Sequence, residues 1–319
     1  MKKWIKAARL RTLPLSISGI LVGSAAAYQN YHTQSNYYII VILCLLTTLF
    51  FQVLSNYAND YGDAVKGTDN ENRVGPKRAV QSGEITKQQM KNAIIITLVL
   101  SLITSVGVIY TSFGNTNFLQ AIIYFVLAIA CVGAAIKYTV GNSAYGYKGL
   151  GDVFVFIFFG LVSTLGTYYL FGHSMDWKIV FPASGIGLLS MAVLNMNNMR
   201  DVENDTVMGK KTMVVKMGYE KAKQYHFYLI IFAVIFINLY AMNVFSKWYQ
   251  FVYAIGFIPL LKNIGIVGKT KNPRLLDPEL KRLSLSTFFI SLLLSIALIL
   301  NALIYENNLS WTRFFSNWS

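Results

Sequence analysis

The chain carries little charge. Only 13% of its 319 residues are Asp, Glu, Lys or Arg, whereas 55% are hydrophobic. A typical soluble domain carries about 25% charged residues, so this deficit excludes an ordinary soluble globular protein. The charge that is present is uneven, with 14 acidic residues against 28 basic ones. The composition therefore predicts a polytopic membrane protein with basic loops.

Cysteine and histidine are also scarce. Cys44 and Cys131 lie in separate apolar runs and form no CxxC pair, which excludes a disulfide framework or a zinc ribbon. The three histidines have no metal-ligand spacing. Basic residues lie in short loops between apolar segments, without a nucleic-acid-binding motif, so we expect no nucleic-acid partner. The oligomeric state stays open.

Long apolar runs fill most of the chain. Nine of them approach the roughly 20 residues that cross a bilayer as a helix. The predicted spans are Leu13–Tyr28, Tyr37–Ser55, Ala93–Thr111, Phe118–Ala135, Val153–Phe171, Ile179–Met196, Phe227–Val244, Trp248–Leu261 and Leu285–Ile304. We therefore predict an all-α polytopic membrane protein with nine transmembrane helices, built as one domain over residues 1–319.

Basic residues collect in alternate loops. All but three of the 28 Lys and Arg residues fall on one side of the predicted bundle, the exceptions being Lys178, Lys247 and Arg313. Cytoplasmic loops carry the excess of Lys and Arg in membrane proteins. We therefore expect the N-terminus in the cytoplasm and the C-terminus outside. The cytoplasmic loops 56–92, 137–152, 199–226 and 262–284 are expected to form a cap over the site.

Acidic residues gather where two predicted helices end. The first cluster places oxygen-bearing side chains at the i, i+3, i+4 and i+7 positions of one helical face: Asn56, Asn59, Asp60 and Asp63. Ionisable groups near hydrocarbon are costly and usually functional. The alternative is a solvated interfacial loop whose carboxylates cap the helix or pair with lysine.

The second cluster repeats this spacing. Asp201 and Asp205 are four residues apart, and Asn198 precedes Asp201 by three. Like charges at this spacing destabilise a helix unless they are compensated. If the two clusters face each other, their carboxylate and amide oxygens suit a hard cation, and Mg²⁺ in turn suits a diphosphate. The sequence therefore predicts a membrane enzyme for a diphosphate-bearing lipid.

Basic side chains follow both clusters. Arg73, Lys77 and Arg78 lie in the loop after the first one, where they could neutralise phosphate oxygens. Lys210 and Lys211 follow Gly209, whose backbone freedom could turn an ammonium back toward the metal.

Two further groups of candidates have alternative interpretations. Tyr138 and Tyr147 could shield a cation, and Lys148 could bind phosphate, unless this loop forms an interfacial aromatic belt. Arg9 and Arg11, close before Pro14, could reach a headgroup or a substrate carboxylate, or could only set the topology.

Four segments together carry a specific resemblance. They are ARLRTLPLS from Ala8, NDYGDAVKGTDNENRVGPKRAVQSG from Asn59, YGYKGLGDVFVFIFFG from Tyr145 and NNMRDVENDTVMGKKT from Asn197. With these motifs, the chain resembles the UbiA superfamily of intramembrane aromatic prenyltransferases over nearly its whole length, and is most similar to its menaquinone-pathway branch. The resemblance implies helices around a central cavity with a lateral opening for lipid. It also implies that Mg²⁺ and the diphosphate are bound by Asn59, Asp60, Asp63, Asp201 and Asp205.

Other positions match the superfamily only in part. The resemblance implies that diphosphate or substrate is contacted by Arg73, Arg78, Lys148 and Lys211. The first motif of the superfamily is often NDxxDxxxD, but its last acidic position is Gly67 here, with Asp69 two residues later. A YxxxK pattern is absent because Tyr138 is followed by Asn142, and Lys148 could compensate.

The activity implied is transfer of a polyprenyl group from polyprenyl diphosphate to 1,4-dihydroxy-2-naphthoate, with loss of CO₂ and diphosphate, giving demethylmenaquinone. Mg²⁺ is the implied cofactor, and a bacterial cytoplasmic (inner) membrane is the implied location. The alternatives are another acceptor such as 4-hydroxybenzoate, a phosphatidyl transferase, or a transporter, which would usually place its carboxylates at the bilayer midplane. We expect Asp60→Asn and Asp201→Asn to leave the fold intact and to abolish turnover.

Overall fold

The fold is helical throughout the part of the chain that the structure describes. A computed structural model describes residues 2–9, 12–70 and 74–316, with side chains as far as Tyr305. The long helices are α2 (Leu13–Tyr31), α3 (Tyr37–Lys66), α4 (Lys87–Phe113), α5 (Phe118–Lys137), α8 (Val180–Arg200), α11 (Tyr219–Val244), α12 (Phe257–Lys269) and α13 (Asp277–Ser316). Shorter α-helical segments are α1 (Lys2–Ala7), α6 (Gly151–Val155), α7 (Thr167–Gly172), α9 (Val202–Val207) and α10 (Met213–Met217). The remaining segments are the π-helix η3 (Phe156–Gly166) and the 3₁₀ segments η2 (Tyr145–Lys148), η4 (Trp177–Ile179), η5 (Trp248–Gly256) and η6 (Pro273–Leu276).

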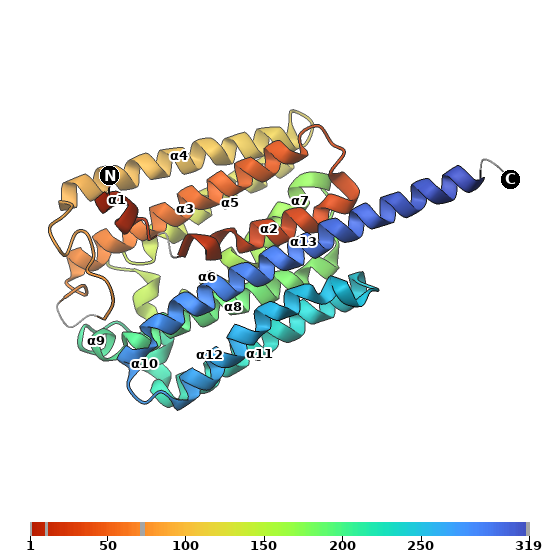
Figure 1. Ribbon diagram of the computed structural model, residues 1–319. Helices are drawn as coiled ribbons and strands as arrows, with labels where there is room; N and C mark the ends of the chain where they lie inside the picture. Colours follow the sequence, from red (N-terminus) through yellow and green to blue (C-terminus); the bar gives the residue numbers. More distant parts are fainter. Residues whose placement is uncertain (1, 10–11, 71–73, 317–319) are drawn as a thin grey trace.

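The long helices run side by side along a common direction (Figure 1). The first of them, α2, packs against the last, α13, so both ends of the chain enter one bundle. On either side of this pair, α3 packs against α4 and α8 packs against α11. Helix α13 projects beyond its neighbours toward the C-terminus (Figure 1).

Eight helical segments of the described chain are long and apolar enough to cross a membrane, from Tyr37–Lys66 to Pro273–Tyr305. Each contains one of the predicted spans. The remaining predicted span is also a helix, α2, but its serines and small residues make it less apolar, and more than half of its residues are buried by the other helices. The predicted all-α membrane fold is confirmed, with eight rather than nine segments that are apolar enough on their own. The chain is an integral membrane protein.

Helix α3 continues beyond its apolar part and carries the first acidic cluster on its last turns. It ends at Gly67, whose φ of 74° is a left-handed conformation and whose N–H donates to the Asp63 carbonyl. A glycine adopts this conformation without the strain that a Cβ would cause. The cluster is therefore held by a helix and does not belong to a solvated loop.

Glycines bring three helical segments into close contact. A Cβ at Gly160 in η3 would lie 2.6 Å from the Cα of Gly187 in α8. A Cβ at Gly23 in α2 would lie 2.5 Å from the carbonyl oxygen of Thr164 in η3. Helices in lipid associate through close van der Waals packing, because the apolar solvent provides no hydrophobic drive between them. The π-helical segment η3 is therefore clamped between α2 and α8.

Replacement of Gly160 by alanine tests this packing. The new methyl group would collide with backbone atoms of α8, which cannot swing away as a side chain can. We expect Gly160→Ala to lower the stability by about 1–3 kcal/mol, the usual range for overpacking. The measurement is the thermal unfolding midpoint of the purified protein in detergent. Gly133→Ala in α5 is the matched control, because a Cβ there meets no atom of the described residues within 4 Å. Equal midpoints for the two variants would refute the close contact.

Candidate active site

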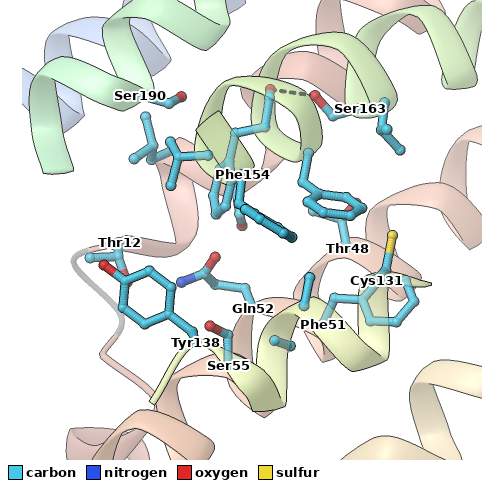
Figure 2. Close-up of a pocket in the computed structure, with 18 of the residues that line it drawn as sticks. Thr12, Thr48, Phe51, Gln52, Ser55, Cys131, Tyr138, Phe154, Ser163 and Ser190 are labelled. Atoms are coloured by element: carbon cyan, nitrogen blue, oxygen red, sulfur yellow. Dashed lines mark hydrogen bonds between the residues drawn. The ribbon is translucent and has the colours of Figure 1, made fainter. Parts of the chain in front are cut away.

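A cavity of about 370 Å³ lies among α2, α3, α4, α5, η3 and α8. Along α3 its lining extends from Cys44 to Asp63, which corresponds to about 28 Å of helix. Side chains such as Phe51, Phe154 and Leu170 make much of this lining apolar, and Figure 2 shows Phe51, Phe154, Tyr138 and Gln52 around the space. The polar lining residues include Arg9, Asn59, Asp63, Arg78, Tyr138, Asn197 and Lys210. The cavity is therefore elongated, with a polar part beside the ends of α3 and α8.

Two members of the first acidic cluster are held at this polar part by neighbouring hydroxyl groups. The Tyr147 hydroxyl donates to Asp63 Oδ1 at 2.8 Å. The Thr139 hydroxyl donates to Asn59 Oδ1 at 3.2 Å. Asn56 also lines the cavity, and its amide donates to the Ala8 carbonyl at 2.9 Å, which ties the N-terminal segment to α3.

Asp60, in the same cluster, does not line the cavity. It is buried, and its two carboxylate oxygens accept the backbone N–H groups of Ala79 at 3.1 Å and Val80 at 3.3 Å. The members of the first cluster share one face of α3 but have different partners. Asn56, Asn59 and Asp63 line the cavity, whereas Asp60 accepts hydrogen bonds from the loop that follows α3.

Asp201 of the second cluster is held by its neighbour Arg200. The Arg200 guanidinium, only 1% exposed, donates through Nε and Nη2 to the two Asp201 oxygens at 2.9 and 2.6 Å. Its other donors reach Asp277 at 2.7 Å and Asn197 at 3.0 Å. This bidentate pair joins the end of α8 to the start of α13 and leaves Asp201 outside the cavity lining.

Asp205 and Lys210 form the part of the second cluster that meets the cavity. The Lys210 ammonium lines the cavity and lies 3.7 Å from Asp205 Oδ1. Burial acts to lower the pKa of Lys210, but the carboxylates of Asp205 and Asp63 outweigh it and raise that pKa above its ordinary value. Lys210 therefore stays charged at neutral pH, between one carboxylate from each cluster.

Tyr147 connects the two clusters. Its hydroxyl reaches Asp63 and lies 2.6 Å from the Thr68 hydroxyl, and its ring lies beneath the ammonium groups of Lys66 and Lys210, 3.9 and 5.5 Å from the ring centre. Burial and the Asp63 charge raise the pKa of Tyr147, so the phenol stays neutral. Asn204 adds a bond from its amide to the Thr68 carbonyl at 3.1 Å. The ends of α3 and α9 therefore meet around this phenol.

Other candidates lie elsewhere. Lys77, Lys148 and Lys211 have exposed side chains and do not line the cavity. Asn198 is buried away from the lining, and its Oδ1 has no hydrogen-bond partner among the residues that the structure describes. Arg11 and Arg73 lie outside the described residues. Asp69, the acidic residue nearest to Gly67, is buried, and its Oδ1 lies 3.7 Å from Arg78 Nε.

The structure also adds polar lining residues that sequence reasoning had not selected, including Gln52 and Asn197. Each lies four residues before a selected residue, Asn56 or Asp201, so extending the helical spacing backwards would have found both. Lys210, rather than Lys211, is the lysine that the turn at Gly209 directs to the cavity.

The donor set fits a cation that a diphosphate shares. Within the described residues, no three His, Cys, Asp or Glu side chains group as metal ligands. Asn59, Asp63 and Asp205 nevertheless supply hard oxygen atoms in or beside the polar part of the cavity. Mg²⁺ usually takes one or two carboxylates and completes its shell with water and substrate phosphates. This arrangement therefore suits a Mg²⁺–diphosphate better than a bare ion.

Comparison with known proteins identifies the family. A model described as the UbiA prenyltransferase family matches residues 16–275. The chain belongs to this family. A relative from Haemophilus influenzae named 1,4-dihydroxy-2-naphthoate octaprenyltransferase is 40% identical, over 94% of this chain and 96% of its own length. A relative of the same name from Escherichia coli is 38% identical, over 88% of this chain and 89% of its own. The resemblance carried by the four motifs is confirmed.

Solved structures of the family agree on the fold. A UbiA homolog from Archaeoglobus fulgidus aligns with a TM-score of 0.64 at 18% identity, covering 93% of this chain and 99% of that one. A structure of a UbiA homolog from the same organism is described as bound to GPP and Mg²⁺. At this level of identity the likeness extends to the arrangement of the helices and no further.

The Arg200–Asp201 pair changes one expectation from the sequence, because Asp201→Asn should now destabilise the fold. Removing one partner of a buried ion pair costs about 3–5 kcal/mol, and we expect less here because Asp277 remains. The measurement is the unfolding midpoint of the purified variant in detergent. Asp63→Asn is the control, since an asparagine oxygen still accepts from Tyr147. An unchanged midpoint for Asp201→Asn would contradict this role of Asp201.

Proposed function

We propose that this chain transfers a polyprenyl group from polyprenyl diphosphate to 1,4-dihydroxy-2-naphthoate, releasing diphosphate and CO₂ and giving demethylmenaquinone in its quinol form. The observation that carries the proposal is 40% identity, over nearly the whole chain, to a relative named for this activity with an octaprenyl donor. The cavity supports it, because oxygen donors and cations occupy one part and apolar side chains the rest. Such a cavity has a place for each half of a polyprenyl diphosphate.

The polar part of the cavity would bind the diphosphate. Asn59, Asp63 and Asp205 are the residues best placed to hold Mg²⁺, which when bound draws charge from the leaving diphosphate and eases cleavage of the allylic C–O bond. Lys210 and Arg78 line the same part and can donate to the diphosphate oxygens, where negative charge develops. Asp60 supports these residues by holding the loop at Ala79. Asp201 supports them through its pair with Arg200.

The rest of the cavity would protect the allylic cation and position the acceptor. Tyr138 lines the cavity beside Tyr145, and its ring can face the cation while apolar walls exclude water. Burial and the Asp152 charge raise the pKa of Tyr138, so its phenol stays neutral. The acceptor carbon that bears the carboxylate then forms the new C–C bond. Loss of CO₂ returns the electron pair to the ring and restores its aromaticity.

The charge pattern supports an orientation for this reaction. We place the N-terminus and the active site on the cytoplasmic side of a bacterial cytoplasmic membrane and the C-terminus outside, because basic residues dominate the loops at the active-site end. Loops 56–92, 137–152, 199–226 and 262–284 would cap the site within one domain, next to the membrane lipid that delivers the prenyl donor.

A product assay tests the reaction and the acceptor together. The purified protein in detergent receives Mg²⁺, a polyprenyl diphosphate and 1,4-dihydroxy-2-naphthoate, with 4-hydroxybenzoate in a parallel reaction. We expect mass spectrometry to find a decarboxylated prenyl-naphthoquinone that disappears when EDTA removes the metal. A product formed only from 4-hydroxybenzoate would keep the reaction class and reject the acceptor. No product in either reaction from folded protein would reject the proposed activity.

The adjacent lysines give a sharper test of the site. Lys210→Met removes the ammonium between Asp63 and Asp205, and we expect kcat/KM for the prenyl diphosphate to fall by about 100-fold or more, because a charge-assisted contact to the leaving group is lost. Lys211→Met removes the same charge from an exposed side chain and should change kcat/KM by less than about threefold. The reverse order of effects would favour the assignment made from the sequence motif.

A further inference from the structure

The loop after the first acidic cluster folds back onto α3. Its residues Ala79 and Ile85 are buried together with Tyr57 of α3 and Met90 of α4 in a small core separate from the main one. Asp60, 1% exposed, accepts two backbone N–H groups of this loop. The carboxylate thus supplies hydrogen-bond acceptors for a buried stretch of backbone that would otherwise lack them.

This anchored stretch directly follows Arg78, which lines the cavity. The Arg78 backbone N–H donates to Gln81 Oε1 at 3.3 Å, and the Gln81 amide donates to the Asn70 carbonyl at 2.8 Å, which closes the loop on itself. The Arg78 guanidinium forms an ion pair with Asp69 at 3.7 Å. The hydrogen bonds within the loop therefore fix the backbone of Arg78, and the ion pair with Asp69 orients its guanidinium.

Turning Asp60 toward a metal would break this arrangement. Both oxygens would leave their N–H partners, and each buried donor left unsatisfied costs about 1–3 kcal/mol. Around the helix, Asp60 lies about 40° from Asn56 and about 60° from Asp63, so its hydrogen bonds, and not its place on α3, separate it from these cavity-lining residues. The two backbone hydrogen bonds therefore disfavour metal ligation by this carboxylate.

We propose that Asp60 is a positioning residue that holds Ala79 and Val80 so that Arg78 reaches the diphosphate, and that it is not a metal ligand. Asp69 has a related task, because it orients the same guanidinium rather than replacing the acidic residue missing at Gly67. The inference rests on the proposed prenyl-transfer function and assigns different roles to carboxylates that the motif groups together.

The test compares Asp60→Asn, Arg78→Ala and the double variant, with Asp63→Asn as the metal-site control. We expect each of the first two to raise KM for the prenyl diphosphate about tenfold, as when one charge-assisted contact is lost. Asp60→Asn should therefore still turn over, in contrast to the loss of turnover expected from the sequence. The double variant should be little worse than either, because both changes act through one contact. The Mg²⁺ concentration for half-maximal rate, at saturating prenyl diphosphate, should stay within about twofold of wild type in Asp60→Asn and rise in Asp63→Asn. Additive losses, or a raised Mg²⁺ requirement in Asp60→Asn, would overturn the proposal.

A second measurement needs neither catalysis nor a variant. Amide hydrogen exchange in the peptide covering Ala79 and Val80 is followed in the wild-type protein as Mg²⁺ and inorganic diphosphate are added. We expect exchange to stay unchanged or to slow, since Asp60 keeps its amide partners. Faster exchange would mean that Asp60 has moved to the metal, and it would reject the inference. This probe contains no acceptor, so a failed naphthoate assay would reject the proposed function and leave this result intact.

Discussion

Burying carboxylates at the edge of a membrane bundle requires compensation for each charge, and the acidic residues differ in which groups supply it. Asp201 receives two donors from a buried guanidinium, and Asp60 receives two backbone N–H groups. Asp63 has a phenol as its hydrogen-bond donor, and Asp205 has an ammonium 3.7 Å away. Asp201 and Asp60 do not line the cavity, and displacing either carboxylate would leave buried donors unsatisfied. Asp63 and Asp205 lie in or beside the cavity, where a cation and a diphosphate can add to the compensation.

The packing of the bundle forms the cavity beside which these acidic residues lie. Contacts at Gly23 and Gly160 fix η3 between α2 and α8. Side chains such as Phe158 and Val162 of η3 then form part of the apolar wall. A π-helix is rare and is found most often at functional sites, because its extra residue per turn changes which side chains face inward. The segment η3 therefore packs closely against α2 and α8 and also borders the cavity. Its packing links the stability of the fold to the shape of the site.

Much of the fold could be predicted from the sequence, because each apolar run of about 20 residues has one stable arrangement in a bilayer. The motifs also indicated which helix ends carry the polar residues. The sequence could not show which members of a motif face the cavity. Asn59 and Asp60 are adjacent in the motif, yet the loop at Ala79 and Val80 binds Asp60, whereas Asn59 lines the cavity. Lys210 and Lys211 differ because the chain turns at Gly209, whose φ is 69°. In both cases the deciding factor is the path of the backbone, which residue identity alone does not specify.

Gly67 illustrates how one backbone conformation can change the composition of a site. The position aligns with the last acid of the superfamily's common motif, but here it ends α3 in a left-handed conformation that glycine favours. The next residue, Thr68, turns back so that its N–H donates to the Asp63 carbonyl and its hydroxyl meets Tyr147. A carboxylate at Gly67 would have space among the described residues, of which only Met208 lies within 4 Å of a Cβ there, but it would strain the turn that joins α3 to α9 through Asn204. The missing acid is therefore a consequence of how α3 ends. The turn that replaces it brings Tyr147 to Asp63 and leaves Asp69 to orient Arg78.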